Sequence, residues 1–169
     1  MEPTAIQGDI AAQSAEALVN AAGTSLEMGS GVAGELRRGA GGPINAEATS
    51  KGPVDLGEIV VTDAYDLNAE FVIHAVAMPH YGDGKATDVS IRTASQNTLE
   101  KADELGCDSL VIPVLGTGVA GFEFERGAQL ICDEIISYEP STLTDVRIIA
   151  YSEADYEQLK SVVDRAIDP

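Results

Sequence analysis

Two glycine-rich segments of this chain have the residue types and spacing that most directly suggest chemistry. Residues 115–122 read L-G-T-G-V-A-G-F, and residues 28–36 read M-G-S-G-V-A-G-E-L. Each segment stands between an expected strand and an expected helix. Glycine lets the backbone approach an anion closely, and successive N–H groups at a helix start can hold a phosphate. Two such segments that face one another predict a diphosphate site.

Alternatives exist for both segments. Either one could be a structural turn that leads into a helix. Residues 115–122 also match G-x-G-x-x-G, the pattern of dinucleotide-binding domains, which raises the alternative of an NAD-dependent oxidoreductase. Against it, the segment follows a late strand, and residues 150–152 at the end of the next strand offer no acidic group for a ribose diol. No hydride-transfer site is recognisable either.

Three other side chains could contact a nucleotide, and each has a structural alternative. Asp9 could accept a hydrogen bond from an adenine amino group, or it could cap the short segment that follows it. Asn20 ends an expected strand, where its amide could bind ribose hydroxyls or form an Asx turn. Tyr151 ends another expected strand, where its ring could stack on a base or lie at the edge of the core.

The remaining chemistry-bearing residues have simpler interpretations. His74 ends an apolar strand pattern, so we expect a buried histidine with satisfied hydrogen bonds. Arg37 and Arg38 are expected on a solvated helix face. Cys107 and Cys132 do not form a disulfide framework, and no histidine, cysteine and acidic residues have metal-ligand spacing. We therefore expect neither a metal nor a cofactor.

Strand and helix patterns alternate along the 169 residues, with no repeat or linker, which predicts one domain over 1–169. Strands are expected at residues 17–19, 58–62, 71–74, 109–114 and 146–150. Helices are expected at residues 32–38, 87–105, 125–138 and 153–167, and another should end at 46–50. Because the strands are apolar throughout, we expect a mostly parallel sheet between helix layers, with ligands beyond the carboxyl ends of its strands.

The charge balance excludes some partners. The chain has 28 acidic and 10 basic residues, a net charge of −18, which argues against binding nucleic acid through its phosphates. The acidic residues are spread over regular segments, so we expect them to coat a folded surface and predict an organism with a salt-rich cytoplasm. No apolar run is long enough to cross a membrane, and no signal peptide is recognisable. The expectation is a cytoplasmic monomer.

The ordered set of motifs resembles the macrodomain family. They read G-D-I at Gly8, V-N-A-A at Val19, G-S-G-V-A-G at Gly29, V-I-H-A-V at Val72 and L-G-T-G-V-A-G-F at Leu115. The likeness runs to the closing helix and is greatest to prokaryotic stand-alone members; with the acidity, it suggests a halophilic archaeon. It implies an α/β fold, a three-layer αβα sandwich with a mixed six-stranded central sheet, and a cleft for ADP-ribose.

The resemblance also assigns roles to individual residues. Asp9 and Ile10 would bind the adenine, Asn20 would contact the distal ribose, and Tyr151 would pack against the adenosine. The remaining contacts would grip the diphosphate and distal ribose from two sides, with Gly31 and Val32 on one side and Thr117, Gly118, Val119 and Ala120 on the other.

Three positions depart from the family pattern. Hydrolytic members often read N-A-A-N at the positions where this chain reads N-A-A-G, so Gly23 stands in place of the second asparagine. Many hydrolytic members also have an aspartate at the position of Ala33. Ser30 replaces the middle glycine of a G-G-G run. Because the first two changes remove side chains implicated in catalysis, the sequence favours binding of ADP-ribose or ADP-ribosylated protein. Hydrolysis of mono-ADP-ribosyl esters or of O-acetyl-ADP-ribose is the alternative.

Overall fold

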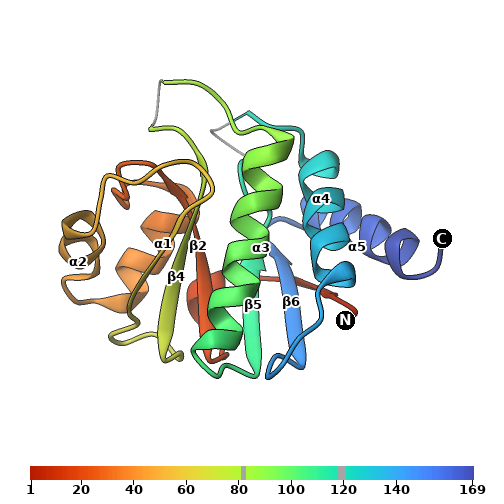
Figure 1. Cartoon of the computed structure of the whole chain (residues 1–169), viewed down its shortest axis with the longest axis horizontal. Coiled ribbons are helices and arrows are strands. Elements are labelled where there is room, and N and C mark those ends of the chain that lie inside the picture. The colour runs from red at the N-terminus through yellow and green to blue at the C-terminus, as the bar shows by residue number, and fades with distance from the viewer. Residues whose placement is uncertain (81–82, 118–120) are drawn as a thin grey trace.

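The computed structural model describes residues 1–80, 83–117 and 121–169 (Figure 1). Its centre is a six-stranded sheet in the order β1-β6-β5-β2-β4-β3, in which β3 is antiparallel to β4 and all other neighbours are parallel. The strands are β1 (Thr4–Gln7), β2 (Ala17–Gly23), β3 (Ile59–Asp63), β4 (Phe71–Met78), β5 (Ser109–Pro113) and β6 (Asp145–Ala150). The predicted α/β sandwich with a mixed sheet is confirmed.

Helices cover both faces of this sheet. They are η1 (Ile10–Ala12), α1 (Gly31–Ala40), α2 (Ile44–Ser50), α3 (Asp88–Glu104), α4 (Phe124–Ser137) and α5 (Glu153–Ile167). Residues of α3, α4 and α5 share one core cluster with the sheet, and residues of α1 and α2 share the other. Figure 1 shows α3 and α4 in front of the strands. Within the described residues, no helix is both long enough and apolar enough to span a bilayer.

The period of the strands explains the two layers. Successive side chains of a strand point to opposite faces. In β2, Ala17 and Val19 pack in the cluster with α3 to α5, whereas Leu18 and Ala22 pack in the cluster with α1 and α2. A strand buried on both faces needs apolar residues at nearly every position, and full burial of each Val or Leu stabilises the fold by about 1.5–3 kcal/mol.

The strands differ from the sequence expectation at their ends. β1 was not predicted, because its four residues are too few to establish a pattern and they pair with β6 alone at the sheet edge. β2 was expected to end at Val19 but continues to Gly23 along β4. Asn20 interrupts the apolar run there, yet the parallel ladder accommodates it because Asn20 pairs in register with His74.

Asn20, His74 and Thr62 form a polar group inside the core. The Asn20 amide Nδ2 donates to His74 Nδ1 at 3.0 Å, which leaves the other ring nitrogen, Nε2, to donate to Thr62 Oγ1 at 2.9 Å. All three side chains are buried, and burial lowers the pKa of His74 to about 4. The expectation of a satisfied core histidine is therefore confirmed.

This burial predicts a pH-dependent stability. The pKa of histidine falls from 6.5 to about 4 on folding, so the unfolded chain binds more protons between these values. The contribution of His74 to the free energy of unfolding is complete above pH 6.5. It is lost as the pH falls towards 4, and the total loss is about 3 kcal/mol. We expect urea unfolding at several pH values to show this loss in the wild type, and a shallower dependence in His74→Gln. Equal pH dependences in both proteins would contradict a neutral buried His74.

Candidate functional site

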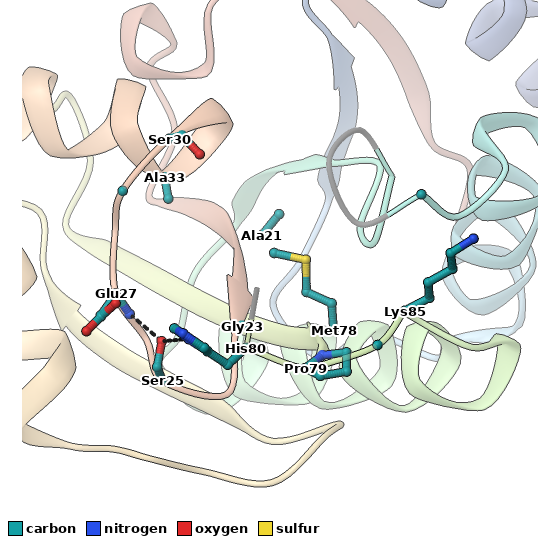
Figure 2. Close-up of a pocket in the computed structure, with 13 residues that line it drawn as sticks. Ala21, Gly23, Ser25, Glu27, Ser30, Ala33, Met78, Pro79, His80 and Lys85 are labelled. Carbon is teal, nitrogen blue, oxygen red and sulfur yellow. Dashed lines mark hydrogen bonds between the residues drawn. The ribbon is translucent and has the colours of Figure 1, made fainter. Parts of the chain in front are cut away.

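A cavity opens at the carboxyl edge of the sheet, where β2 separates from β5. These strands pair only through Ala17 and Leu18, whereas β2 stays paired with β4 to its end. The connection after β2 leads to α1 on one face, and the connection after β5 leads to α4 on the other. Such divergence points are where α/β sheets bind ligands. The cavity here has a volume of about 540 Å³ (Figure 2).

The connection after β2 and the start of α1 form the first wall, which Gly29, Ser30 and Ala33 line. Met28 is buried, and its N–H donates to Asn45 Oδ1 at 2.8 Å, which fixes the segment against α2. Gly31 has φ +59°, a conformation that favours glycine. Ser30 precedes α1 but makes no side-chain cap, so its hydroxyl accepts no hydrogen bond from the first N–H groups of α1.

The connection after β5 contributes Gly121 to the opposite wall. Gly116 has φ +76°, and a Cβ there would lie 2.6 Å from the Cβ of Ala86, so only glycine fits. Thr117 Oγ1 donates to the carbonyl of Val114 at 2.8 Å, and the N–H of Phe122 donates to the carbonyl of Gly116 at 3.2 Å. These contacts close the base of the glycine-rich segment that the sequence predicted as a phosphate loop.

The third wall was missed by the sequence analysis and follows β4. It contributes Pro79, His80, Gly84 and Lys85. The His80 N–H donates to Thr24 Oγ1 at 3.1 Å, so this wall is tied to the connection after β2. A usable signal was present, because these residues contain glycine and also stand between a parallel strand and a helix.

Lys85 supplies a positive charge to the cavity. Its Nζ lies 3.7 Å from the Cβ position of Gly121, beside the connection after β5. The other lysines, Lys51, Lys101 and Lys160, each form an ion pair with a glutamate or aspartate. Among the described residues no carboxylate lies within ion-pair distance of Lys85, although the chain carries a net charge of −18. The ammonium group is therefore free to meet an anion.

Comparisons with known proteins identify the fold family. The Macro domain model matches residues 19–131. The chain belongs to the macrodomain family. An uncharacterised protein of Saccharolobus solfataricus is 39% identical over 162 residues, which cover 93% of this chain and 89% of the relative. O-acetyl-ADP-ribose deacetylase 1 of Pantoea vagans is 37% identical over 161 residues, covering 91% of this chain and 94% of the relative.

Solved macrodomains share the architecture. The Oceanobacillus iheyensis macrodomain with ADP superposes with a TM-score of 0.85 at 26% identity, over 97% of this chain and 90% of that one. The Trypanosoma brucei macrodomain in complex with ADP-ribose gives a TM-score of 0.84 at 24% identity, over 94% of this chain and 68% of that one.

The predicted adenosine residues of this macrodomain gather at the ends of β1 and β6, outside the lining of the cavity. The N–H of Gly8 donates to the carbonyl of Ala150 at 3.0 Å, which places Asp9 and Ile10 beside the segment that begins with Tyr151. Ile10 is buried. Tyr151 is 69% exposed, so the alternative of a tyrosine at the edge of the core is wrong, and its ring is open to a ligand.

Asp9 has a structural role in addition to its predicted one. Its Oδ1 accepts the N–H of Ala11 at 2.9 Å, which confirms the helix-cap alternative. Burial and the neighbouring Asp9 carboxylate raise the pKa of Glu35. The contact with adenine stays a prediction, to be made by the second carboxylate oxygen.

Asn20 must be reassigned. The side chain has no exposed surface, shares its face of β2 with Leu18 and Ala22, and donates to His74. Because side chains alternate along a strand, Ala21 and Gly23 line the cavity instead. We therefore withdraw the predicted ribose contact and give Asn20 a supporting role.

The other predicted contacts stand at or near the cavity walls. Gly31 is exposed and Val32 is half-buried at the start of α1, next to the lining residue Ser30. Thr117 is half-buried at the base of its segment. Gly118, Val119 and Ala120 lie outside the described residues.

Substitution of Asp9 can separate its two roles. In Asp9→Asn the amide oxygen can still cap η1, but the other position becomes an amide donor that cannot accept from adenine. We expect Asp9→Asn to keep its melting temperature and to bind ADP-ribose about tenfold more weakly, whereas Asp9→Ala should also lose about 0.5–2 kcal/mol of stability. Calorimetry and thermal melting measure both effects. An unchanged affinity of Asp9→Asn for ADP-ribose would mean that Asp9 caps η1 and makes no contact with adenine.

Proposed function

We propose that this macrodomain binds ADP-ribose, free or attached to a protein. The observation that carries this proposal is the cavity between the start of α1 and the connection after β5, with Lys85 beside it. Backbone N–H groups on both walls and one ammonium group suit a diphosphate. The support from relatives is that solved macrodomains hold ADP and ADP-ribose.

In this proposal the ligand extends across the carboxyl edge of the sheet. The adenosine lies at Asp9, Ile10 and Tyr151. The distal ribose lies towards the end of the cavity at Gly23 and Ala33. The diphosphate is held by residues from both glycine-rich segments, namely Gly31, Val32, Thr117, Gly118, Val119 and Ala120.

Ester hydrolysis is the second candidate function. The relative from Pantoea vagans is named O-acetyl-ADP-ribose deacetylase 1, and it shares 37% identity over 91% of this chain. Gly23 and Ala33 lack the side chains that many hydrolytic members carry, so any hydrolysis must draw on other groups of the cavity.

Binding should depend on the whole ligand and on the Lys85 charge. We expect ADP-ribose to bind more than about tenfold tighter than AMP in calorimetry, because AMP leaves the second phosphate and distal-ribose contacts unused.

Lys85→Met should weaken the binding of ADP-ribose about fivefold, the effect of one exposed charge contact. Lys160→Met makes the same charge change on α5 and should leave the affinity unchanged.

Two outcomes would contradict this arrangement. Equal affinities for AMP and ADP-ribose would remove the diphosphate site from the proposal. Equal effects of Lys85→Met and Lys160→Met would mean that only the net charge of the protein matters, since both variants change it by the same amount.

We further infer that the protein acts as a monomer in a salt-rich cytoplasm. Among the residues that the structure describes, Glu134 is the only buried acidic one, so the other carboxylates repel one another through solvent. The Debye length falls to about 3 Å near 1 M salt, which screens this repulsion. We expect the unfolding midpoint in urea to rise from low to molar KCl; an unchanged midpoint would argue against a halophilic source.

A further inference from the structure

A histidine and a serine face one another at the Gly23 end of the cavity (Figure 2). His80 Nδ1 and Ser25 Oγ are 3.0 Å apart, and both residues line the cavity. Ser25 Oγ also accepts the N–H of Glu27 at 3.3 Å, and the N–H of His80 donates to Thr24 Oγ1 at 3.1 Å. The imidazole is therefore fixed at its backbone and at one ring nitrogen.

The pair stands where the family resemblance places the missing catalytic side chain. A Cβ at Gly23 would lie 3.6 Å from the Cα of His80 and 3.1 Å from the carbonyl oxygen of Pro79. The segment after β4 thus lies directly against the position at which hydrolytic macrodomains carry asparagine. Glycine at this position leaves room for His80 to approach the end of the cavity.

We propose that His80, oriented by Ser25, is the proton-transfer group for hydrolysis of carboxylic esters of the distal ribose. This inference rests on the proposed binding of ADP-ribose in the same cavity. When His80 Nδ1–H donates to Ser25 Oγ, the lone pair is on Nε2, for which no protein partner exists within the described residues. Histidine in this tautomer is a suitable general base.

The reaction balances without a further reagent. Water adds to the ester carbonyl carbon while Nε2 of His80 takes a proton from it. The tetrahedral intermediate then breaks its bond to the ribose oxygen, and the imidazolium returns the proton to that oxygen. The products are a carboxylic acid and ADP-ribose with a free hydroxyl. Ser25 is a positioning residue in this scheme and forms no bond to the acyl group.

The chemistry defines the substrate class. A carboxylic ester, whether an acetyl group or an acidic side chain of a protein, presents a carbonyl carbon to the water. An N-glycosidic link to arginine presents none, so ADP-ribosyl-arginine should not be cleaved by this route.

The test uses O-acetyl-ADP-ribose and measures release of ADP-ribose. We expect wild-type turnover, a fall in kcat of at least about 100-fold in His80→Ala, and partial recovery on addition of imidazole. Ser25→Ala should lower kcat about tenfold, whereas Ser25→Thr, which keeps the hydroxyl, should have a kcat close to that of the wild type. Ser50→Ala removes an exposed serine hydroxyl on α2 and should leave kcat unchanged. Melting curves and ADP-ribose calorimetry on every variant separate catalysis from folding and binding.

Several results would overturn the inference, and they differ from failure of the proposed function. Tight ADP-ribose binding by the wild type without turnover would remove the hydrolase and leave the binding module. Turnover that persists in His80→Ala would assign catalysis to other groups. An acyl group on Ser25, detected by mass spectrometry, would make the serine a nucleophile. Absence of ADP-ribose binding would remove both proposals together.

Discussion

The separation of β2 from β5 is the constraint on which the cavity depends. Their ladder ends after Leu18, while β2 stays paired with β4 through Gly23. The sheet therefore continues on one side of β2 and opens on the other. The chain leaves β2 towards one helix layer and β5 towards the other, so their connections must stand apart at this edge. The space between them is the cavity, which is lined by residues of both connections.

The sequence predicted well the elements in which apolar residues follow the regular pattern of a buried strand or of a helix with one buried face. Apolar runs identified the strands that lie between two helix layers, and the long helices followed from their apolar faces and end signals. The pattern was insufficient where a polar residue lies inside a buried strand. In β2, the polar Asn20 breaks the run although it lies in the core, because its partner His74 comes from a strand 54 residues away. Such compensation depends on tertiary pairing.

The same reason limited the prediction of the site. The two glycine-rich segments could be recognised because phosphate contact through the backbone leaves a local signature. Glycine in the connection after β4 marks that segment as a candidate wall, but nothing local distinguishes His80 or Lys85, since each is a single residue in a polar connection. His80 is held in the cavity by Ser25, which is 55 positions away in the sequence. Lys85 lies beside Gly121 of the connection after β5. Side chains that act through distant partners become visible only when the fold brings the partners together.

The contact between Gly116 and Ala86 restricts how this cavity can evolve. With a Cβ position 2.6 Å from the Ala86 methyl group, position 116 has no room for a side chain, and position 86 has little room for a larger one. Two of the walls are therefore joined at one fixed point. Pro79, His80, Gly84 and Lys85 line the cavity without being part of that contact, so substitutions at these positions can change the selectivity of the cavity. Homologues with different substrates should accordingly diverge between β4 and residue 86 while both contact positions remain small.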